Sequence, residues 1–385
     1  MKLEALQAND GDCLLLHYGD GATSGLILID GGSRGVYRNV LEKRLDELRA
    51  GKSVLNMRLV VVSHIDADHI TGLLDMFREM SEQKSDGKVP RWKVGSLWHN
   101  AFEKTVGSHS AAVQSATVGA ASAGSPNLDL LRNQGLQEKA LAVVASVKQG
   151  KDLQRFATSL TRINAETDGK LIVAPKSGRT DIKIDKTLTF TILGPAENEL
   201  DNLEEAWNKS KQAKVQEQSV AADYLNRTVP NLSSIVFLAE EKSSSGESNR
   251  ILFTGDAGGD LILKGLEAAN LLDDNHQIKV DVLKVQHHGS KHSVEQGFFE
   301  QVRADAYVIS GNGAHGIPNL ETLEWLSQAR KGEPFHVYMT NHELVDKQKN
   351  YTTDLDNFLE EEKRSQPQHE YHFRQDSQLS ITVTS

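Results

Sequence analysis

The stretch RLVVVSHIDADHI, residues 58–70, decides the fold. An apolar run is followed at once by four potential ligands within six positions, which are His64, Asp66, Asp68 and His69. Short runs rich in Val and Leu, closed by polar residues, are typical of strands. Sites in α/β sheets form beyond the carboxyl ends of such strands, and His and Asp side chains bind divalent metals. The stretch therefore predicts a buried strand that ends in a metal site.

A plainer interpretation of this stretch is a polar turn, with Asp68 as the N-cap of a helix over residues 71–80. That interpretation gives neither histidine a role. One metal centre rarely takes four ligands from six residues, whereas two metals about 3.5–4 Å apart can share one loop. We therefore expect a site for two divalent ions.

Three other apolar runs also end in residues that bind metals. They are GLILID, RILFTGD and VDVLKVQH, which end at Asp30, Asp256 and His287. Because the carboxyl ends of neighbouring parallel strands meet at one edge of a sheet, these side chains are expected near the first cluster. The second histidine pair, His287 and His288, is followed by a glycine that leaves backbone room for a ligand.

Strands and helices alternate along most of the chain, which predicts an α/β fold. Helical spacing of apolar residues over 36–50 and 71–80 separates the early strands, and the same alternation resumes after about residue 232. We expect one domain over residues 1–385, with an insertion at 105–186 that shapes a pocket.

The middle of the chain differs from the rest in amino-acid composition. Segments 127–165 and 199–227 are rich in Gln, Lys, Ala and Glu, which favours helices. Between them, KLIVA (170–174) and TLTFTILGP (187–195) are predicted to form a strand pair. An alternative hypothesis is that the insertion serves as a surface for a protein partner.

Composition limits the class of protein and its partners. The chain is 38 % hydrophobic and 25 % charged, and its net charge is −10. An acidic surface disfavours long nucleic acid, so a small nucleotide or single-stranded substrate is expected. No signal peptide and no membrane-spanning run is evident. A single cysteine, Cys13, is expected to be buried and suits a reducing cytoplasm. The oligomeric state is left open.

Four motifs carry a resemblance to a known family. In their order and spacing, IDGG (29–32), SHIDADH (63–69), FTGDAGG (253–259) and QHHGS (286–290) resemble the metallo-β-lactamase fold superfamily. More narrowly they are similar to the hydrolase domain of the ComEC competence protein. The resemblance covers roughly residues 2–100 and 187–345, and it implies a four-layer αββα sandwich with a helical insertion.

The resemblance also implies roles for single residues. His64 and Asp66 would bind the first metal, and Asp68 and His69 the second. Asp256 would bridge the two metals. His287 would complete the second site, although the sequence leaves open which histidine of the pair touches metal.

Further roles follow from the same resemblance. His288 would contact the substrate, and Asp30 would orient the ligand loop. The mid-chain histidine of the family corresponds to His99, for which a core or surface histidine is an equally open interpretation. Most members carry His where Asp66 stands, and an oxygen ligand makes Mn²⁺ compatible beside the expected Zn²⁺.

These residues predict a metal-dependent hydrolase, with Asp68, His288 and Asp30 in catalytic roles. A hydroxide bridging two metals would attack a phosphodiester, as in a phosphodiesterase or nuclease. Lys291 and His315 are candidate phosphate contacts, as is His292. Hydrolysis of an ester, lactone or thioester on the same metals is an alternative, because the fold hosts many chemistries. A non-catalytic partner-binding protein is another.

Overall fold

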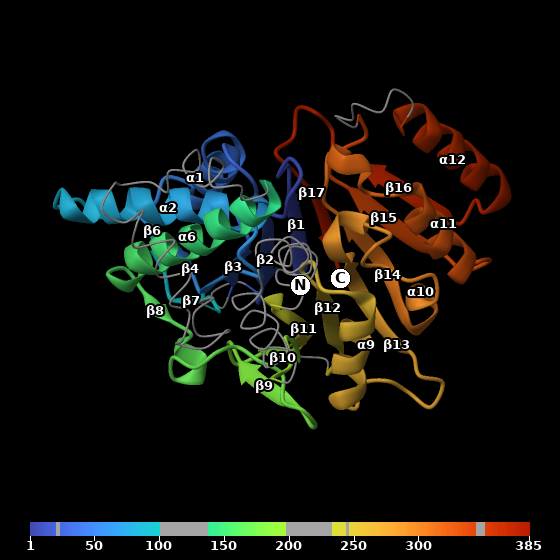
Figure 1. Ribbon diagram of the computed structural model, residues 1–385, viewed down its shortest axis with the longest axis horizontal. Coiled ribbons are helices and arrows are strands. Elements are labelled where there is room, and N and C mark those ends of the chain that lie inside the picture. The colour runs from blue at the N-terminus through green and yellow to red at the C-terminus, as the bar shows by residue number, and fades with distance from the viewer. Residues whose placement is uncertain (21–23, 101–137, 198–232, 244–245, 344–350) are drawn as a thin grey trace, which may run out of the picture.

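The computed structural model describes residues 1–385 apart from 21–23, 101–137, 198–232, 244–245 and 344–350, and it leaves out the side chains of 138–147 and His315. The described chain is a mixed α/β protein with two large sheets (Figure 1). A third, two-stranded sheet pairs β4 (Leu55–Met57) with β6 (Trp92–Val94).

The first large sheet has seven strands in the order β17-β1-β2-β3-β5-β7-β8. Its strands are β1 (Lys2–Leu6), β2 (Leu14–Tyr18), β3 (Gly25–Ile29), β5 (Leu59–Val61), β7 (Ser96–Trp98), β8 (Arg162–Ile163) and β17 (Ser380–Thr384). Strands β3, β5, β7 and β8 are parallel neighbours, so their carboxyl ends share one edge of the sheet.

The second large sheet has eight strands in the order β16-β15-β14-β13-β12-β11-β10-β9. Its strands are β9 (Thr180–Lys183), β10 (Leu188–Gly194), β11 (Val236–Lys242), β12 (Ser248–Phe253), β13 (Ile278–Lys284), β14 (Val302–Ile309), β15 (Phe335–Met339) and β16 (His369–Phe373). Strands β12 to β16 are parallel, which again gathers carboxyl ends at one edge.

A hydrophobic cluster joins the two sheets, because it takes buried side chains from both of them. Trp98 of the first sheet meets Phe190 of the second edge-on, with ring centroids 5.7 Å apart. Phe237 stacks between Phe190 and Phe253 at 4.5 and 4.8 Å. Alternate residues of each strand therefore face the other sheet, as expected for two packed sheets.

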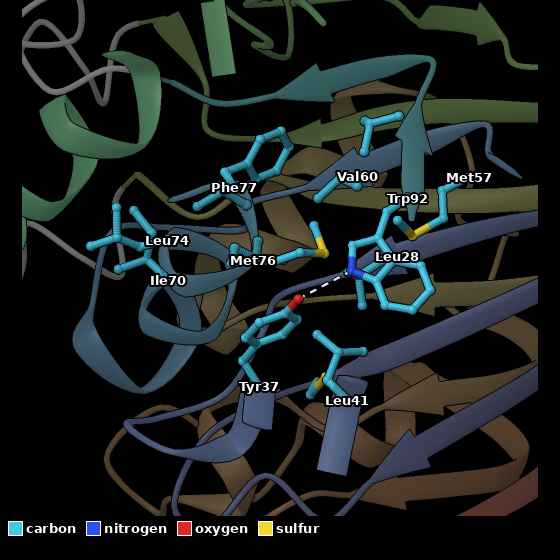
Figure 2. Close-up of a cluster of buried hydrophobic side chains, with 14 of the residues drawn as sticks. Leu28, Tyr37, Leu41, Met57, Val60, Ile70, Leu74, Met76, Phe77 and Trp92 are labelled. Atoms are coloured by element: carbon cyan, nitrogen blue, oxygen red, sulfur yellow. Dashed lines mark hydrogen bonds between the residues drawn. The ribbon is translucent and has the colours of Figure 1, made fainter. Parts of the chain in front are cut away.

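The other face of the first sheet packs against helices α1 (Glu42–Arg49), α2 (Ala67–Ser85) and α6 (Glu138–Thr158), and against the π-helical turn η2 (Tyr37–Leu41). Figure 2 shows this cluster, in which the Trp92 indole donates a hydrogen bond to the Tyr37 hydroxyl at 3.1 Å. Tyr37 in turn donates to Glu79 at 3.1 Å. The polar ends of the aromatic rings are thus satisfied inside the core.

The other face of the second sheet packs against helices that lie on the opposite side of the molecule in Figure 1. These helices are α9 (Gly259–Ala268), α10 (Phe298–Gln301), α11 (Leu320–Ala329) and α12 (Tyr351–Ser365). None of the helices that the structure describes is both long enough and apolar enough to cross a membrane.

Most predicted strands and helices are present. One predicted strand is wrong: residues 170–174 form no strand and make only an isolated bridge from Ala174 to Ala196. Asn100 explains this, because its side-chain amide accepts from the backbone N–H of Ile172 and donates to its carbonyl. β10 pairs with β9 and β11 instead. The predicted helix at 199–227 lies outside the described residues.

The described part of the predicted insertion, residues 138–186, is integrated into the core. α6 packs on α2, β8 extends the first sheet and β9 is the outer strand of the second. Leu153 and Ala157 of α6 are buried in the first helical cluster. The rest of the insertion lies outside the described residues.

Candidate metal centre

The first cluster of ligands sits between β5 and α2. Helix α2 begins at Ala67 with Asp66 as N-cap, and the Asp66 side chain makes no capping hydrogen bond. Asp68 lies in the first turn of the same helix. The interpretation of Asp68 as a polar cap is therefore wrong, and both carboxylates are available for another role.

Glycines allow the backbone around this loop to close up. A Cβ added to Gly72 of α2 would lie 1.9 Å from the Gly31 carbonyl oxygen, and one added to Gly11 would lie 1.7 Å from that of Asp68. No side chain fits at these distances. The glycines of IDGG and NDGD thus bring the Asp30 turn and the residue 11 turn directly onto the start of α2.

Asp30 hydrogen-bonds to two residues of the loop that carries the first cluster of ligands. It is fully buried and has a left-handed backbone with φ 57°. Its carboxylate accepts hydrogen bonds from the Ser63 backbone at 2.8 Å and the Ser63 hydroxyl at 2.5 Å. It also contacts Nδ1 of His69 at 2.9 Å. Asp30 thus fixes the positions of Ser63 and His69, and its role in orienting metal ligands stays a prediction.

The second histidine pair follows β13 in an unusual backbone conformation. His287 and His288 both lie in the left-handed region, with φ 46° and 54°. Consecutive left-handed residues other than glycine are strained, and such strain is concentrated at functional sites. Nδ1 of His288 contacts the Ser310 carbonyl at 3.0 Å, and Nδ1 of His287 contacts the Ser293 hydroxyl at 2.6 Å.

These contacts fix the tautomers of His69 and His288. A carboxylate or carbonyl oxygen can only accept, so Nδ1 of each ring carries the proton. Their Nε2 atoms lie 3.3 Å apart and face one another. Two lone pairs at that distance repel unless a positive charge lies between them. Imidazoles held in this way by their second nitrogen are typical metal ligands.

Asp256 stands between two sets of ligands. Its Oδ1 lies 3.4 Å from Nε2 of His69 and 3.6 Å from Nε2 of His288. Its Oδ2 lies 3.7 Å from Nε2 of both His64 and His287. One carboxylate thus offers one oxygen to each of two histidine pairs, which is the arrangement of a bridging ligand.

The tightest group comprises Asp68, His69, Asp256 and His288, whose ligand atoms all lie within 4.8 Å of one another. Asp68 Oδ2 is 3.5 Å from Nε2 of His288 and 3.7 Å from Nε2 of His69. Asp66 is not part of this group, and its Oδ2 lies 3.8 Å from Nε2 of His64. The predicted residues of the first cluster therefore do converge with Asp256.

The electrostatics of the site favour a cation. Although 36 % of the Asp66 side chain is exposed, desolvation together with the carboxylates of Asp68 and Asp256 raises its pKa to about 7. Burial lowers the pKa of His288, but Asp256 and Asp12 outweigh it and raise that pKa to about 10. The clustered carboxylates thus favour positive charge at this site, either as protons on its imidazoles or as a metal cation.

Two buried polar atoms of the site without a hydrogen-bond partner also favour a bound cation. Nε2 of His64 and Oδ1 of Asp256 are buried and make no hydrogen bond. An unsatisfied buried polar group is costly unless it has another partner. The donor set of imidazole nitrogens and carboxylate oxygens fits Zn²⁺ or Mn²⁺.

The two histidines of the second pair occupy different places in the site. The resemblance implied His287 at the second metal and His288 near the substrate, and the sequence left open which of the two touches metal. In the structure His288 belongs to the tight group, and His287 faces Oδ2 of Asp256 together with His64. The left-handed turn at both residues sends the two rings in different directions, with an interplanar angle of 76°.

His99 is buried at the end of β7, but it is not part of the tight group. Its backbone N–H donates to Asn164. A Cβ added to Gly150 of α6 would lie 3.6 Å from its Nε2 and 3.4 Å from Ile65. His99 is thus packed between the ligand loop and α6, and its role as a metal ligand stays a prediction.

Two of the three predicted phosphate contacts, Lys291 and His292, do not line the cavity at the site. Lys291 pairs with Glu321, and His292 is exposed. The backbone of His315 lies in the 3₁₀ turn Ala314–Gly316, while its side chain is outside the described structure.

Sequence reasoning missed a buried ion pair beneath His288. Asp12 and Lys284 are each 1 % exposed and lie 2.7 Å apart. Asp12 also lies 3.4 Å from Nδ1 of His288. A lysine inside an apolar strand, in VDVLKV, was the available signal, since a buried lysine needs a carboxylate partner. Asp12 therefore helps to hold the His288 ring.

A cavity of about 510 Å³ opens onto the cluster. Asp68, His287 and His288 line its floor, and Arg34 and Asn312 line it as well. Gln149 of α6 also lines the cavity and donates to Thr71 of α2 at 3.1 Å. The segment predicted as an insertion thus contributes to this pocket.

Comparison with protein-family models and with curated proteins finds no match to this chain. The candidate site therefore rests on its own geometry.

Proposed function

We propose that this chain is a metal-dependent hydrolase of phosphodiesters. The observation that carries the proposal is the pair of facing Nε2 atoms of His69 and His288, 3.3 Å apart and flanked by the carboxylates of Asp68 and Asp256. Such a cluster is suited to a metal cation, and it opens onto a cavity large enough for a small substrate.

The proposal includes the fold family. Two packed sheets with helices on both outer faces, and ligands at strand ends, support a four-layer αββα sandwich of the metallo-β-lactamase type. The similarity of the four sequence motifs to those of the ComEC hydrolase domain is part of the same proposal. Buried Cys13 is compatible with the proposed cytoplasmic setting.

Asp68, His69, Asp256 and His288 would hold one cation, and the set around Asp256 Oδ2 would hold the other. Divalent cations there would lower the pKa of water and polarise a phosphoryl oxygen. Asp30 keeps His69 in the tautomer that presents Nε2 to the site. The Ser310 carbonyl does the same for His288.

The cavity supports an anionic substrate. Arg34 contributes a guanidinium that matches two phosphate oxygens, and the Asn312 side chain can donate a further hydrogen bond. The net charge of −10 disfavours a long duplex that needs an extended basic track. A small nucleotide or a single-stranded end fits this cavity best.

The test uses the purified chain loaded with Zn²⁺ or Mn²⁺, and bis-p-nitrophenyl phosphate beside a panel of lactones and thioesters. We expect phosphodiester turnover that falls at least about 100-fold in Asp68→Asn, since even outer partners of metals are worth 10–100-fold. Asp75→Asn, on the same helix and paired with Arg78, is the matched control and should retain activity. Turnover of lactones or thioesters alone would overturn the substrate class.

Arg34→Ala tests the anion contact separately. It should raise KM for the phosphodiester more than it lowers kcat, because Arg34 lines the cavity without joining the ligand cluster. Arg78→Ala is the control. An unchanged KM in Arg34→Ala would remove Arg34 from the binding site.

A further inference from the structure

A second group of metal-binding side chains lies on the edge of the eight-stranded sheet. Its members are His336 on β15 and Glu370 and His372 on β16. β15 and β16 run parallel, with His336 opposite Glu370 and Tyr338 opposite His372. Residues two apart on a strand share a face, so the three ligand side chains project from one face of the sheet.

The opposite face of the same strands is occupied. Phe335, Val337 and Met339 are buried in the cluster beneath the helices, and Tyr371 and Phe373 pack against it. The histidines and the glutamate are therefore not core residues. The exposed fraction of the side chain is 43 % for His336, 57 % for Glu370 and 36 % for His372. A hydrated cation can therefore reach all three.

The distances match a tetrahedral zinc ion. Nδ1 of His336 lies 3.1 Å from Nε2 of His372. Oε2 of Glu370 lies 3.4 Å from the first nitrogen and 3.6 Å from the second. Ligands about 2.0–2.1 Å from zinc in a tetrahedron are separated by about 3.3–3.4 Å. The three atoms thus already stand near the corners of one face of such a tetrahedron.

The histidine rings are held in place by aromatic contacts. Tyr338 stacks on His372 with centroids 4.6 Å apart and an angle of 23°. The His336 and His372 rings lie edge to edge and nearly parallel, with centroids 5.3 Å apart and an angle of 29°. Because a preorganised site loses less side-chain freedom on binding, this stacking favours metal affinity.

We propose that His336, Glu370 and His372 bind one zinc ion, with water as the fourth ligand, and that this ion ties edge strand β16 to β15. The group shares no residue with the candidate hydrolase centre, so the inference does not rest on the proposed function. Zinc is favoured over calcium or magnesium because two of three ligands are imidazoles.

The test is a Zn²⁺ titration of the chelator-treated full chain by calorimetry, with elemental analysis of the loaded protein. His372→Ala should bind one equivalent less than wild type and leave metal binding at the group of Asp68, His69, Asp256 and His288 unchanged. Glu370→Gln, the mildest change at the most exposed ligand, should weaken this binding step about tenfold or more while leaving the fold intact. His276→Ala, an exposed histidine outside both groups, is the matched control.

A second measurement identifies the site directly. Co²⁺ bound in place of zinc should give a tetrahedral visible spectrum that persists in His288→Ala and is reduced in His372→Ala. Zinc should also raise the melting temperature of His288→Ala by more than that of the double variant with His372→Ala. Equal stoichiometry and affinity in wild type, His372→Ala and Glu370→Gln would overturn the proposal.

Discussion

Nε2 of His69 faces Nε2 of His288 at 3.3 Å, across 219 residues of sequence. Each ring is locked by an acceptor on its other nitrogen, Asp30 for His69 and the Ser310 carbonyl for His288. The fold therefore brings two imidazole nitrogens together inside a buried, carboxylate-rich site, where a proton or a metal cation has to lie between them.

Alanine substitutions should distinguish the roles of His287 and His288 in metal binding. His288→Ala should weaken Zn²⁺ binding at the tight group by about 100-fold, because it removes one of the four gathered ligands. His287→Ala should weaken a second binding step and spare the first, since His287 faces the other oxygen of Asp256. Calorimetric Zn²⁺ titration measures both.

His292→Ala is the control for these two variants, because His292 is exposed and outside the cluster. The reverse order of effects, with His287 dominant at the tighter step, would show that His287 and not His288 completes the tighter site.

Asp12 is predicted to act on both stability and metal affinity. Asp12→Asn leaves the ammonium of Lys284 buried without a countercharge, which costs about 3–5 kcal/mol. It also removes a contact to the His288 ring, so Zn²⁺ affinity should fall about tenfold. Denaturant unfolding and metal titration give the two values.

The double variant Asp12→Asn/Lys284→Met distinguishes these effects. It should recover part of the stability, since no lone charge remains buried, but none of the metal affinity. Recovery of both together would show that Asp12 serves the fold alone.

The close approach of two turns predicts a steric effect at Gly72. Gly72→Ala places a Cβ 1.9 Å from the Gly31 carbonyl oxygen and should lower the free energy of unfolding by about 1–3 kcal/mol or more. Gly297→Ala is the matched control, because a Cβ there meets nothing within 4 Å. Equal stability of the two variants, measured by chemical denaturation, would contradict the observed backbone contact.

Acid stability should depend on Glu4. Burial raises its pKa, but hydrogen bonds from His17, Arg44 and Ser380 outweigh burial and lower the pKa from 4.5 to about 2. A carboxylate with a lowered pKa stabilises the fold above its unfolded pKa, and that contribution disappears as the pH falls from about 4.5 to about 2. The shift corresponds to on the order of 3 kcal/mol.

Glu4→Gln should therefore have a lower free energy of unfolding than wild type at pH 7. Between pH 4.5 and 2 its free energy of unfolding should also fall less steeply than that of wild type. Glu47→Gln is the control, since Glu47 pairs with the same Arg44 but is 56 % exposed. Unfolding free energies across this pH range are the measurement. Parallel curves for wild type and Glu4→Gln would refute the role of Glu4.

The strand-end rule predicted most of the candidate site. Asp30, His64, Asp256 and the histidine pair follow apolar runs, and parallel strands bring such ends to one edge. Local pattern could not tell which histidine of the pair enters the tight group. That choice depends on two left-handed backbone residues, His287 and His288, whose conformations the surrounding turn imposes.

Other errors have equally local causes. Residues 170–174 have the composition of a strand, yet the side chain of Asn100 bonds both backbone groups of Ile172 in place of a strand partner. Asp12 lies in NDGD, which has the composition of an ordinary turn, and its partner Lys284 is 272 positions away. Long-range pairing of buried charges leaves no periodic signal in sequence.

The most direct test of the metal centre is anomalous diffraction at the zinc edge from crystals of the Zn²⁺-loaded chain. The account predicts a peak enclosed by His69, His288, Asp68 and Asp256. Zinc peaks confined to other places, with Nε2 of His69 and His288 still facing each other across an empty gap, would contradict it.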